Sequence, residues 1–433
     1  MLHDQFATLK NRIIKNNTIN PDYYQEYEVK RGLRNRDGSG VLAGLTNISS
    51  VVGSKIIDGD SIAVDGELKF RGIPLLEFMS DFDENKKYCF ETLVFLLLVG
   101  DLPTDAELKD FSAALASQRH IPNEILEHVI KGVPSQNMMN KLQTAISALY
   151  AFDETAESVN PYDNFLQSVS LIAKLPAIIA YSYLATYVDN PQFVKAPEHL
   201  THAEAFLYMF NQGKEASSLE NHILDLSLGL HAEHGGGNNS TFTTYVVSSS
   251  ASDIYSTTAA SVGSLKGPLL GSANKKVRDM MQDIQANMSD LTSESELTDY
   301  VNKILNKEAH DKSGKLYGLG HAVYTKSDPR AIVIKDLAKK LAKKYDREDE
   351  LQLYFNLEKL GPELFNTFKG SKKVISPNVD FFSGFVYDCL SFPVEIYTPL
   401  FAMARCAGWC AHRIEEGLSG KRIIRPGYKF VKN

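Results

Sequence analysis

The chain has 433 residues, and its 43% hydrophobic and 23% charged residues are typical of a globular protein. Because one hydrophobic core usually stops growing at about 250–300 residues, this length predicts two domains. A net charge of −7 argues against nucleic acid or an anionic membrane as the main partner, since both require a clustered basic surface.

The first elements predicted along the chain are short strands. Residues 1–17 lack the apolar core of a signal peptide, which predicts a cytoplasmic location. Residues 49–73 contain β-branched runs separated by Asp-Gly pairs, and such pairs favour hairpin turns. We therefore expect small antiparallel strands in this segment, whereas most of the remaining chain has helical periodicity.

Two apolar segments raise the question of a membrane span. Residues 93–99 are too short to cross a bilayer. Residues 169–188 are long enough, but Lys174, Pro176 and several hydroxyl groups are costly in lipid, so we predict a buried central helix and no membrane association. Residues 240–267, which are rich in Ser, Thr and Ala, are predicted to form one long helix in a tightly packed centre or a subunit interface.

A more charged, Lys-rich segment over residues 275–350 predicts a peripheral helical domain. Ser293 and Glu296 have the spacing of a capping box, and an amphipathic pattern follows them. We predict a mostly α-helical fold in which a smaller domain is inserted into a larger one. The predicted boundaries are residues 1–273 and 378–433 for the larger domain and residues 274–377 for the smaller domain.

No metal site is predicted. The four cysteines have no CxxC spacing, which supports neither a zinc site nor a disulfide framework, and Cys406 and Cys410 are predicted to be reduced core residues one helical turn apart. His231 and His234 lie three residues apart before a triple-glycine loop, a spacing that also occurs in metal pairs. Because no third ligand is near, a structural role is favoured for this pair.

The segment YGLGHAVYTKSDPRA, residues 317–331, is a candidate for binding a small oxyacid. Gly318 and Gly320 permit a tight backbone path around His321, and an Asp-Pro turn presents Arg330. A histidine can polarise a carbonyl, and a guanidinium binds a carboxylate through two nitrogens. A simple connection between helices is the alternative.

Asp380 lies inside an apolar run next to Phe381 and Phe382. A lone carboxylate there loses hydration, which raises its proton affinity and suits a catalytic base. An aspartate before an apolar helix is also a common N-cap. The spacing alone does not decide between these two roles.

Taken together and in order, these stretches resemble the citrate synthase family. Other stretches that carry the resemblance are RGLRNRDGSGVLAGLTNISSV from residue 31, ELKFRGI, LQTAISALYAFD, LIAKLPAIIAY, AEAFLYMF and RIIRPG. The resemblance implies a mostly helical homodimer with a large domain and a smaller, mobile one. It also implies condensation of an acyl-CoA co-substrate, usually acetyl-CoA, with oxaloacetate, followed by thioester hydrolysis without a metal or prosthetic group.

The resemblance also implies roles for individual residues. Asp380 corresponds to the base that deprotonates the acyl α-carbon, and His321 to the group that polarises the oxaloacetate carbonyl. The residues implied in oxaloacetate binding are His234, Asn238, Arg330 and Arg405, together with Arg425 supplied by the other subunit. The backbone of Gly318, Leu319 and Gly320 corresponds to the loop that receives the adenine of CoA.

One position departs from the family pattern. The turn LKGPLLGSAN, residues 265–274, has Leu270 where the family usually has a histidine that donates a hydrogen bond to the thioester oxygen. Ser240, whose counterpart steadies that histidine, is present. Loss of one oxyanion donor typically lowers turnover by about 10²–10³-fold. We therefore expect slow turnover unless a water molecule, Asn238, Asn239 or Ser272 replaces the donor.

Two hypotheses remain at this stage. The first is a citrate or 2-methylcitrate synthase with a substituted donor, and the retained aspartate, histidines and arginines favour it. The second is a non-catalytic protein that binds a dicarboxylate and CoA with a regulatory role, which Leu270 favours. Leu270 is either a natural divergence or an introduced substitution, and Ser272 beside it favours natural divergence.

Overall fold

The computed structural model describes residues 7–35, 39–58, 60–83, 86–420 and 422–431. It divides into two compact units, of which the smaller comprises Met1–Leu45 and Ile423–Asn433 and the larger Thr46–Arg422. The described helices of the smaller unit are short and bury no residue. They are η1 (Ala7–Leu9), α2 (Lys10–Asn17), α3 (Asp22–Glu26) and η2 (Arg31–Leu33).

The predicted strands form a three-stranded antiparallel sheet at the start of the larger unit. Strands β1 (Ser49–Ile57), β2 (Asp60–Phe70) and β3 (Ile73–Pro74) are paired in the order β1-β2-β3. Asp58 in the first turn has a φ of 54°, as the Asp-Gly prediction requires. At Gly53 of β1 a Cβ atom would lie 2.2 Å from the carbonyl oxygen of Val323, so glycine allows the sheet to pack directly on the segment after His321.

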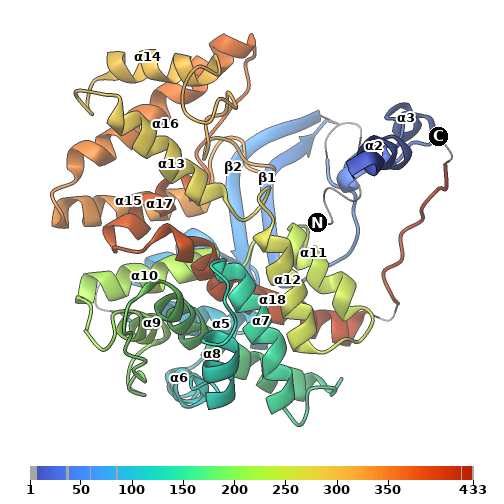
Figure 1. The fold of residues 1–433 in the computed structure, drawn as a ribbon, viewed down its shortest axis with the longest axis vertical. Helices are drawn as coiled ribbons and strands as arrows, with labels where there is room; N and C mark the ends of the chain where they lie inside the picture. Colours follow the sequence, from blue (N-terminus) through green and yellow to red (C-terminus); the bar gives the residue numbers. More distant parts are fainter. Residues whose placement is uncertain (1–6, 36–38, 59, 84–85, 421, 432–433) are drawn as a thin grey trace. The chain divides into compact units, whose positions relative to one another are not determined.

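The rest of the larger unit is helical (Figure 1). Its helices are α4 (Leu75–Ser80), α5 (Cys89–Val99), α6 (Asp105–Gln118), the π-helical η3 (Ile125–Ile130), α7 (Met138–Leu149), η4 (Tyr150–Phe152), α8 (Pro161–Tyr187), α9 (His202–Phe210), α10 (Ser218–His231), α11 (Asn239–Ser248), α12 (Ile254–Lys266), α13 (Ala273–Ala286), α14 (Glu294–Leu305), α15 (Pro329–Lys344), α16 (Glu348–Lys369), α17 (Val379–Cys389), η5 (Val394–Ile396) and α18 (Tyr397–Ser419). The mostly α-helical fold with minor N-terminal strands is confirmed.

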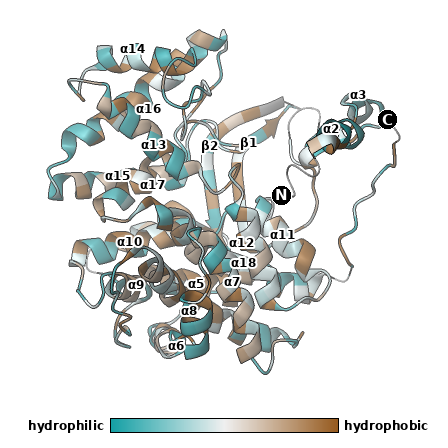
Figure 2. Ribbon diagram, in the orientation of Figure 1, coloured by the Kyte–Doolittle hydropathy of each residue, from teal (hydrophilic) through white to brown (hydrophobic). Residues whose placement is uncertain are grey.

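Helix α8 is the one described helix with the length and composition of a membrane span. In its apolar window, 72% of the residues are buried inside the protein, as predicted for a core helix. Helix α18 packs against α8, α5 and α11, and it is buried from Tyr397 to Arg413 over most of its length. Figure 2 shows hydrophobic residues concentrated around α5 and α9 and hydrophilic residues on α3 and along α14.

The prediction of one long helix over residues 240–267 is wrong. The segment forms two helices, α11 and α12, which pack against each other. Ala251 between them has a φ of 62°, and the Asp253 carboxylate caps α12 by accepting a hydrogen bond from the Ser256 N–H. An internal capping aspartate offers the backbone an alternative to a continuous helix.

Helices α13 to α15, from the charged segment, and α16, which follows it, pack with α17 in the same part of the larger unit (Figure 1). Ser293 caps α14 as expected, but the Glu296 carboxylate accepts hydrogen bonds from Ser289, so the capping box is not formed. The domain division at residues 274 and 377 stays a prediction. Cys406 and Cys410 are buried free thiols, with 3.8 Å between their sulfur atoms.

Candidate active site

A cavity of about 290 Å³ gathers most of the predicted site residues from segments far apart in the sequence. The predicted residues that line it are His234, Asn238, Leu270, Gly320, His321, Arg330, Asp380 and Arg405. Three predicted residues are not among its lining: Ser240, Gly318 and Leu319. Arg425 belongs to the smaller unit, and its predicted place in the site of another subunit stays a prediction.

His321 is held by the backbone on both sides. The Gly320 N–H donates to the Ser376 carbonyl at 2.8 Å, and the Asn378 side chain donates to the Gly320 carbonyl at 2.8 Å. Gly318 has a φ of +80°, and a Cβ there would lie 2.8 Å from the Phe381 ring, so the loop requires glycine at this position. This packing fixes the loop against the first turn of α17.

The imidazole of His321 is neutral and has a defined tautomer. Its Nδ1 accepts hydrogen bonds from the N–H groups of Val323 at 3.0 Å and Tyr324 at 3.1 Å, so its proton is on Nε2. Burial, and then the charge of Arg330, lower the pKa of His321 to about 4. A neutral imidazole that donates from Nε2 can polarise a carbonyl without adding a formal charge to the site.

His234 lies beside His321, with 5.2 Å between the ring centroids. Its buried Nε2 has no hydrogen-bond partner within the described residues. Burial and the charges of Arg330 and Arg405 hold the pKa of His234 well below its usual value, so this imidazole is also neutral. It is therefore available to bind a ligand in the cavity.

Arg330 and Arg405 are the two cations of the cavity. Both are almost fully buried, with 3% and 1% of their surface exposed. Arg330 forms a two-point ion pair with Asp328, through Nε at 3.0 Å and Nη2 at 2.8 Å. Arg405 donates from Nε to the His231 carbonyl at 2.6 Å, while its Nη2 is buried without a partner in the described structure.

Arg405 therefore carries a positive charge with little compensation. Burial lowers its pKa to about 10, although the charge of Glu233 opposes that effect. A buried guanidinium without a directly bonded carboxylate is costly, and an anionic ligand removes that cost. The charge and the free nitrogen of Arg405 suit the cavity to a carboxylate ligand.

Asp380 is the second residue of α17, and the N-cap of this helix is Asn378, whose side chain accepts the Asp380 N–H at 3.0 Å. The N-cap role proposed for Asp380 is therefore wrong. Burial raises the pKa of the Asp380 carboxyl to about 6, although the charge of Arg330 opposes this shift. A carboxylate with raised proton affinity beside a neutral imidazole can act as a general base near neutral pH.

The turn that carries Leu270 is closed by two hydrogen bonds from the N–H groups of Leu270 and Gly271 to the Gly267 carbonyl, each 3.0 Å long. Leu270 is partly buried and lines the cavity, whereas Leu269 is fully exposed at 100%. Thr398 of α18 donates to the Gly271 carbonyl and anchors the turn. The wall at position 270 is apolar.

Ser240 is buried and donates to the Ser264 hydroxyl at 3.1 Å. Among the predicted substitutes for the missing donor, Ser272 donates to the Pro268 carbonyl, and Asn239 accepts from Ser264. Neither of these two residues lines the cavity, whereas Asn238 does.

Comparison with known proteins agrees with this geometry. Residues 36–427 match the family model described as "Citrate synthase, C-terminal domain". The chain belongs to the citrate synthase family. It is 35% identical to the citrate synthase of Synechocystis over 91% of this chain and 89% of that protein. It is 32% identical to a citrate/2-methylcitrate synthase of Bacillus subtilis, over 90% of this chain and 95% of the relative.

A solved structure of the same family is also similar. It is the citrate synthase of Thermoplasma acidophilum in a ternary complex with carboxymethyl coenzyme A and oxaloacetate. The TM-score is 0.75 at 28% identity, and the similarity covers 94% of this chain and 97% of the other. Membership of the citrate synthase family, as predicted from the sequence, is confirmed.

A second cavity, of about 540 Å³, lies next to the one that contains Asp380 and includes the backbone predicted to bind CoA. The predicted CoA-binding backbone of Gly318, Leu319 and Gly320 lines it, as do Lys276, Lys315 and Lys373. The two cavities share four lining residues: Leu269, Ala273, Gly320 and Asn378. A basic cleft thus adjoins the cavity that contains Asp380.

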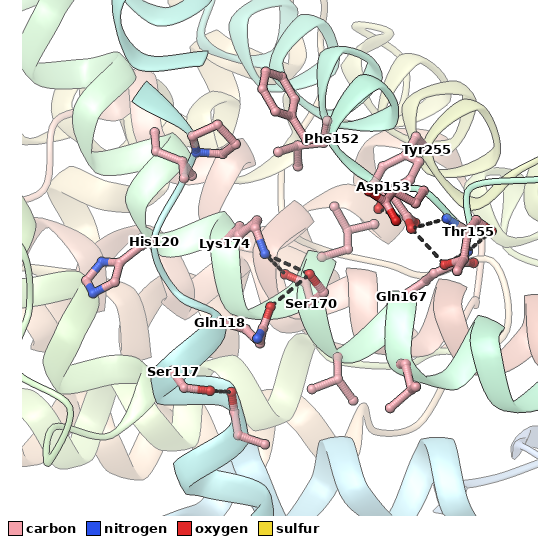
Figure 3. Close-up of a pocket in the computed structure, with 18 residues that line it drawn as sticks. Ser117, Gln118, His120, Phe152, Asp153, Thr155, Gln167, Ser170, Lys174 and Tyr255 are labelled. Carbon is pink, nitrogen blue, oxygen red and sulfur yellow. Dashed lines mark hydrogen bonds between the residues drawn. The ribbon is translucent and has the colours of Figure 1, made fainter. Parts of the chain in front are cut away.

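A third and larger cavity, of about 730 Å³, has none of the predicted site residues in its lining. Figure 3 shows Lys174 bonded to Ser170, and Asp153 bonded to Thr155. The remaining oxygen of Asp153 accepts from Tyr255 at 2.8 Å. The candidate active site is therefore chosen by the chemistry of its lining residues and not by cavity size.

A buried ion pair that was not predicted from the sequence lies beside the cavity. Glu233 accepts hydrogen bonds through Oε1 from His412 at 2.9 Å, Ser49 at 2.8 Å and the Gly235 N–H at 2.5 Å. Both ionic side chains are 0% exposed. The pair fixes the start of the triple-glycine loop, and the only sequence signal was a carboxylate placed between His231 and His234.

His231 has a structural position. It is buried, its ring nitrogens have no hydrogen-bond partner in the part of the chain that the structure describes, and the centroid of its ring lies 4.9 Å from that of Phe401. Within the described residues no group of three or more His, Cys, Asp or Glu side chains is arranged to hold a metal ion. The two histidines therefore differ in position: His231 packs in the core, whereas His234 lines the cavity.

Proposed function

We propose that this protein condenses an acyl-CoA with oxaloacetate to give a citrate-type tricarboxylate and free CoA. The observation that carries the proposal is the single cavity in which Asp380, His321 and the uncompensated guanidinium of Arg405 meet. This combination provides a base, a neutral carbonyl polariser and a carboxylate receptor. These are the groups that such a condensation requires.

Oxaloacetate binds through its carboxylates to Arg330 and Arg405, with His234 and Asn238 as further contacts. Arg405 has the unpaired nitrogen, and Arg330 retains one terminal nitrogen after its two bonds to Asp328. Arg425 of a second subunit completes the set, which makes the working unit a homodimer with shared sites.

The acyl-CoA lies in the adjoining basic cleft, where the lysines face its phosphates and the Gly318–Gly320 backbone receives the adenine. Asp380 removes a proton from the acyl α-carbon, and the resulting carbanion equivalent forms a bond to the oxaloacetate carbonyl carbon. His321 donates its Nε2 proton to the new alkoxide. Water then cleaves the thioester to give a carboxylate and the CoA thiol. No permanent cofactor takes part.

The acyl group is acetyl or propionyl. The name of one relative, citrate/2-methylcitrate synthase, fits both of these acyl groups. The proposed location is the cytoplasm, without a membrane or nucleic-acid partner. Closure of the smaller domain, residues 274–377, over bound oxaloacetate is part of the proposal.

A second candidate function is non-catalytic binding of a dicarboxylate and CoA, which the apolar side chain of Leu270 favours. Release of thiol from acetyl-CoA or propionyl-CoA, with and without oxaloacetate, separates the two functions. An enzyme releases thiol only when oxaloacetate is present, and Asp380→Asn abolishes that release. A binding protein retains oxaloacetate in calorimetry but releases no thiol.

A further inference from the structure

The cavity holds a polar side chain to which no role has been assigned. We propose that Asn274, together with the backbone N–H groups at the start of α13, donates the hydrogen bonds to the thioester oxygen that Leu270 cannot. This inference rests on the proposed condensation, whose first step, removal of a proton from the acyl α-carbon, places negative charge on the thioester oxygen.

Asn274 is in the right place for this role. It is the second residue of α13 and lines the same cavity as Leu270 and Asp380. Its backbone carbonyl oxygen lies 3.4 Å from the place where a Cβ atom would be if residue 384 were not glycine. Gly384 is four residues after Asp380 in α17 and therefore on the same helix face. The start of α13 thus packs on the face of α17 that carries the base.

The carboxamide of Asn274 has no partner. The residue is only 4% exposed, and within the described residues its side chain forms no hydrogen bond. Buried amides are nearly always hydrogen-bonded, because burial without a partner is unfavourable. The amide atoms of Asn274 are not among the polar atoms sealed from solvent without a partner, so they are open to the cavity that the residue lines. A mostly buried side chain whose unpartnered amide faces a cavity points to a ligand that accepts its hydrogen bond.

The helix terminus adds a second set of donors. Ser272 is the N-cap of α13 but makes no side-chain bond to the helix, because its hydroxyl donates to the Pro268 carbonyl. The first turn of this 14-residue helix also contains no acidic residue. Its N–H groups and the positive end of its dipole are therefore free to stabilise negative charge, and Ala273 of this turn lines the cavity.

Asn238 is the remaining substitute from the sequence analysis, but it comes from the start of α11 and not from the turn of Leu270 or the start of α13. Its Oδ1 caps α11 by accepting the Ser240 N–H at 3.1 Å, and it follows the glycine loop that begins after His234. This position suits oxaloacetate. Asn274, which adjoins the turn of Leu270 and the basic cleft, suits the thioester.

The proposed step is balanced without a further reagent. The α C–H bond of the acyl group breaks, its proton forms an O–H bond on Asp380, and the electron pair moves to the thioester oxygen. The Nδ2–H of Asn274 donates a hydrogen bond to that oxygen but transfers no proton. The intermediate is therefore an enolate, which then attacks the oxaloacetate carbonyl.

The test compares Asn274→Ala with the matched variant Asn287→Ala, since Asn287 lies at the other end of α13 and does not line the cavity. We expect Asn274→Ala to lower kcat by about 10²-fold, the usual effect of removing an oxyanion donor, with unchanged calorimetric affinity for oxaloacetate. Deuterium uptake into the acetyl group of acetyl-CoA in D₂O, with malate in place of oxaloacetate, should fall in parallel. Asn287→Ala should match the wild type in both assays.

A rescue experiment distinguishes donation from a purely structural role. Leu270→His supplies an imidazole donor, so it should restore much of the turnover lost in Asn274→Ala and have a smaller effect in the wild type. Equal turnover of Asn274→Ala and the wild type would overturn the proposal, as would failure of Leu270→His to rescue. A wild type that binds oxaloacetate but neither releases thiol nor exchanges deuterium would overturn the proposed function as well.

Discussion

Replacement of Arg405 by Met separates substrate binding from the stability of the fold. Met preserves much of the length and apolar contact of the side chain but removes its charge and all of its donors. Arg405 is 1% exposed and has a buried nitrogen without a partner, so its charge is costly in the empty protein. That cost is the basis of the prediction.

The two effects have different expected sizes. A pKa lowered from 12.5 to about 10 corresponds to about 3 kcal/mol of unfavourable burial, which Met removes. Met also loses the bond from Arg405 Nε to the His231 carbonyl, worth about 1.5–3 kcal/mol for a charged donor. The free energy of unfolding should therefore change little. Loss of two charge-assisted bonds to a substrate carboxylate, at about 1.5–3 kcal/mol each, should weaken oxaloacetate binding by about 10²–10⁴-fold.

Calorimetric titration with oxaloacetate and urea unfolding measure the two quantities. Arg413→Met is a matched control, because Arg413 is another buried arginine of α18 that bonds to Asn164 and does not line the cavity. The control should bind oxaloacetate as the wild type does. Unchanged oxaloacetate affinity in Arg405→Met would refute the assignment of Arg405 as a carboxylate receptor.

Three other predictions concern titration, the buried ion pair and the subunit contact. Because burial raises the pKa of Asp380 to about 6, kcat/KM should fall as the pH is lowered through about 6, and a pH–rate profile that is flat across this range would contradict Asp380 as the base. Burial lowers the pKa of His412, but Glu233 outweighs this and raises it to about 9. His412→Gln leaves Glu233 buried and unpaired and should lower the free energy of unfolding by about 3–5 kcal/mol in urea titrations. In the wild type, the contribution of protonated His412 to the free energy of unfolding should be complete below its unfolded pKa of about 6.5 and lost as the pH rises through about 9. A free energy of unfolding that does not change with pH over this range would contradict the prediction. Arg425→Ala should weaken oxaloacetate binding while sedimentation still detects a dimer, and unchanged affinity would remove Arg425 from the site.

Several site features were predictable because their signals are local. Gly318, Gly320, His321 and Arg330 follow one another within a single loop, and the order of such motifs along the chain identified the family. The β-branched runs predicted the antiparallel strands correctly, and Asp58 lies in the first turn, but the second Asp-Gly pair, Asp65-Gly66, lies inside β2 and forms no turn. In each case the determining residues are neighbours in the sequence.

Two of the wrong predictions share one cause. Asp380 was a possible N-cap, but Asn378 two residues earlier takes that position. The residues from 240 to 267 have helical composition throughout, yet Asp253 starts a new helix within them. Where several residues can cap a helix, packing against neighbouring elements decides which of them does, and this competition is invisible in a linear pattern.

The sequence by itself determined which chemical groups are present and which of them lie on the same loop or helix. Only the tertiary structure decided their protonation and their partners. Glu233 and His412 are 179 residues apart, and their ion pair exists only because α18 packs beside the glycine loop. The raised pKa of Asp380 and the uncompensated charge of Arg405 likewise follow from burial by distant elements. Desolvation depends on every atom that surrounds a group, and most of those atoms belong to residues remote in sequence.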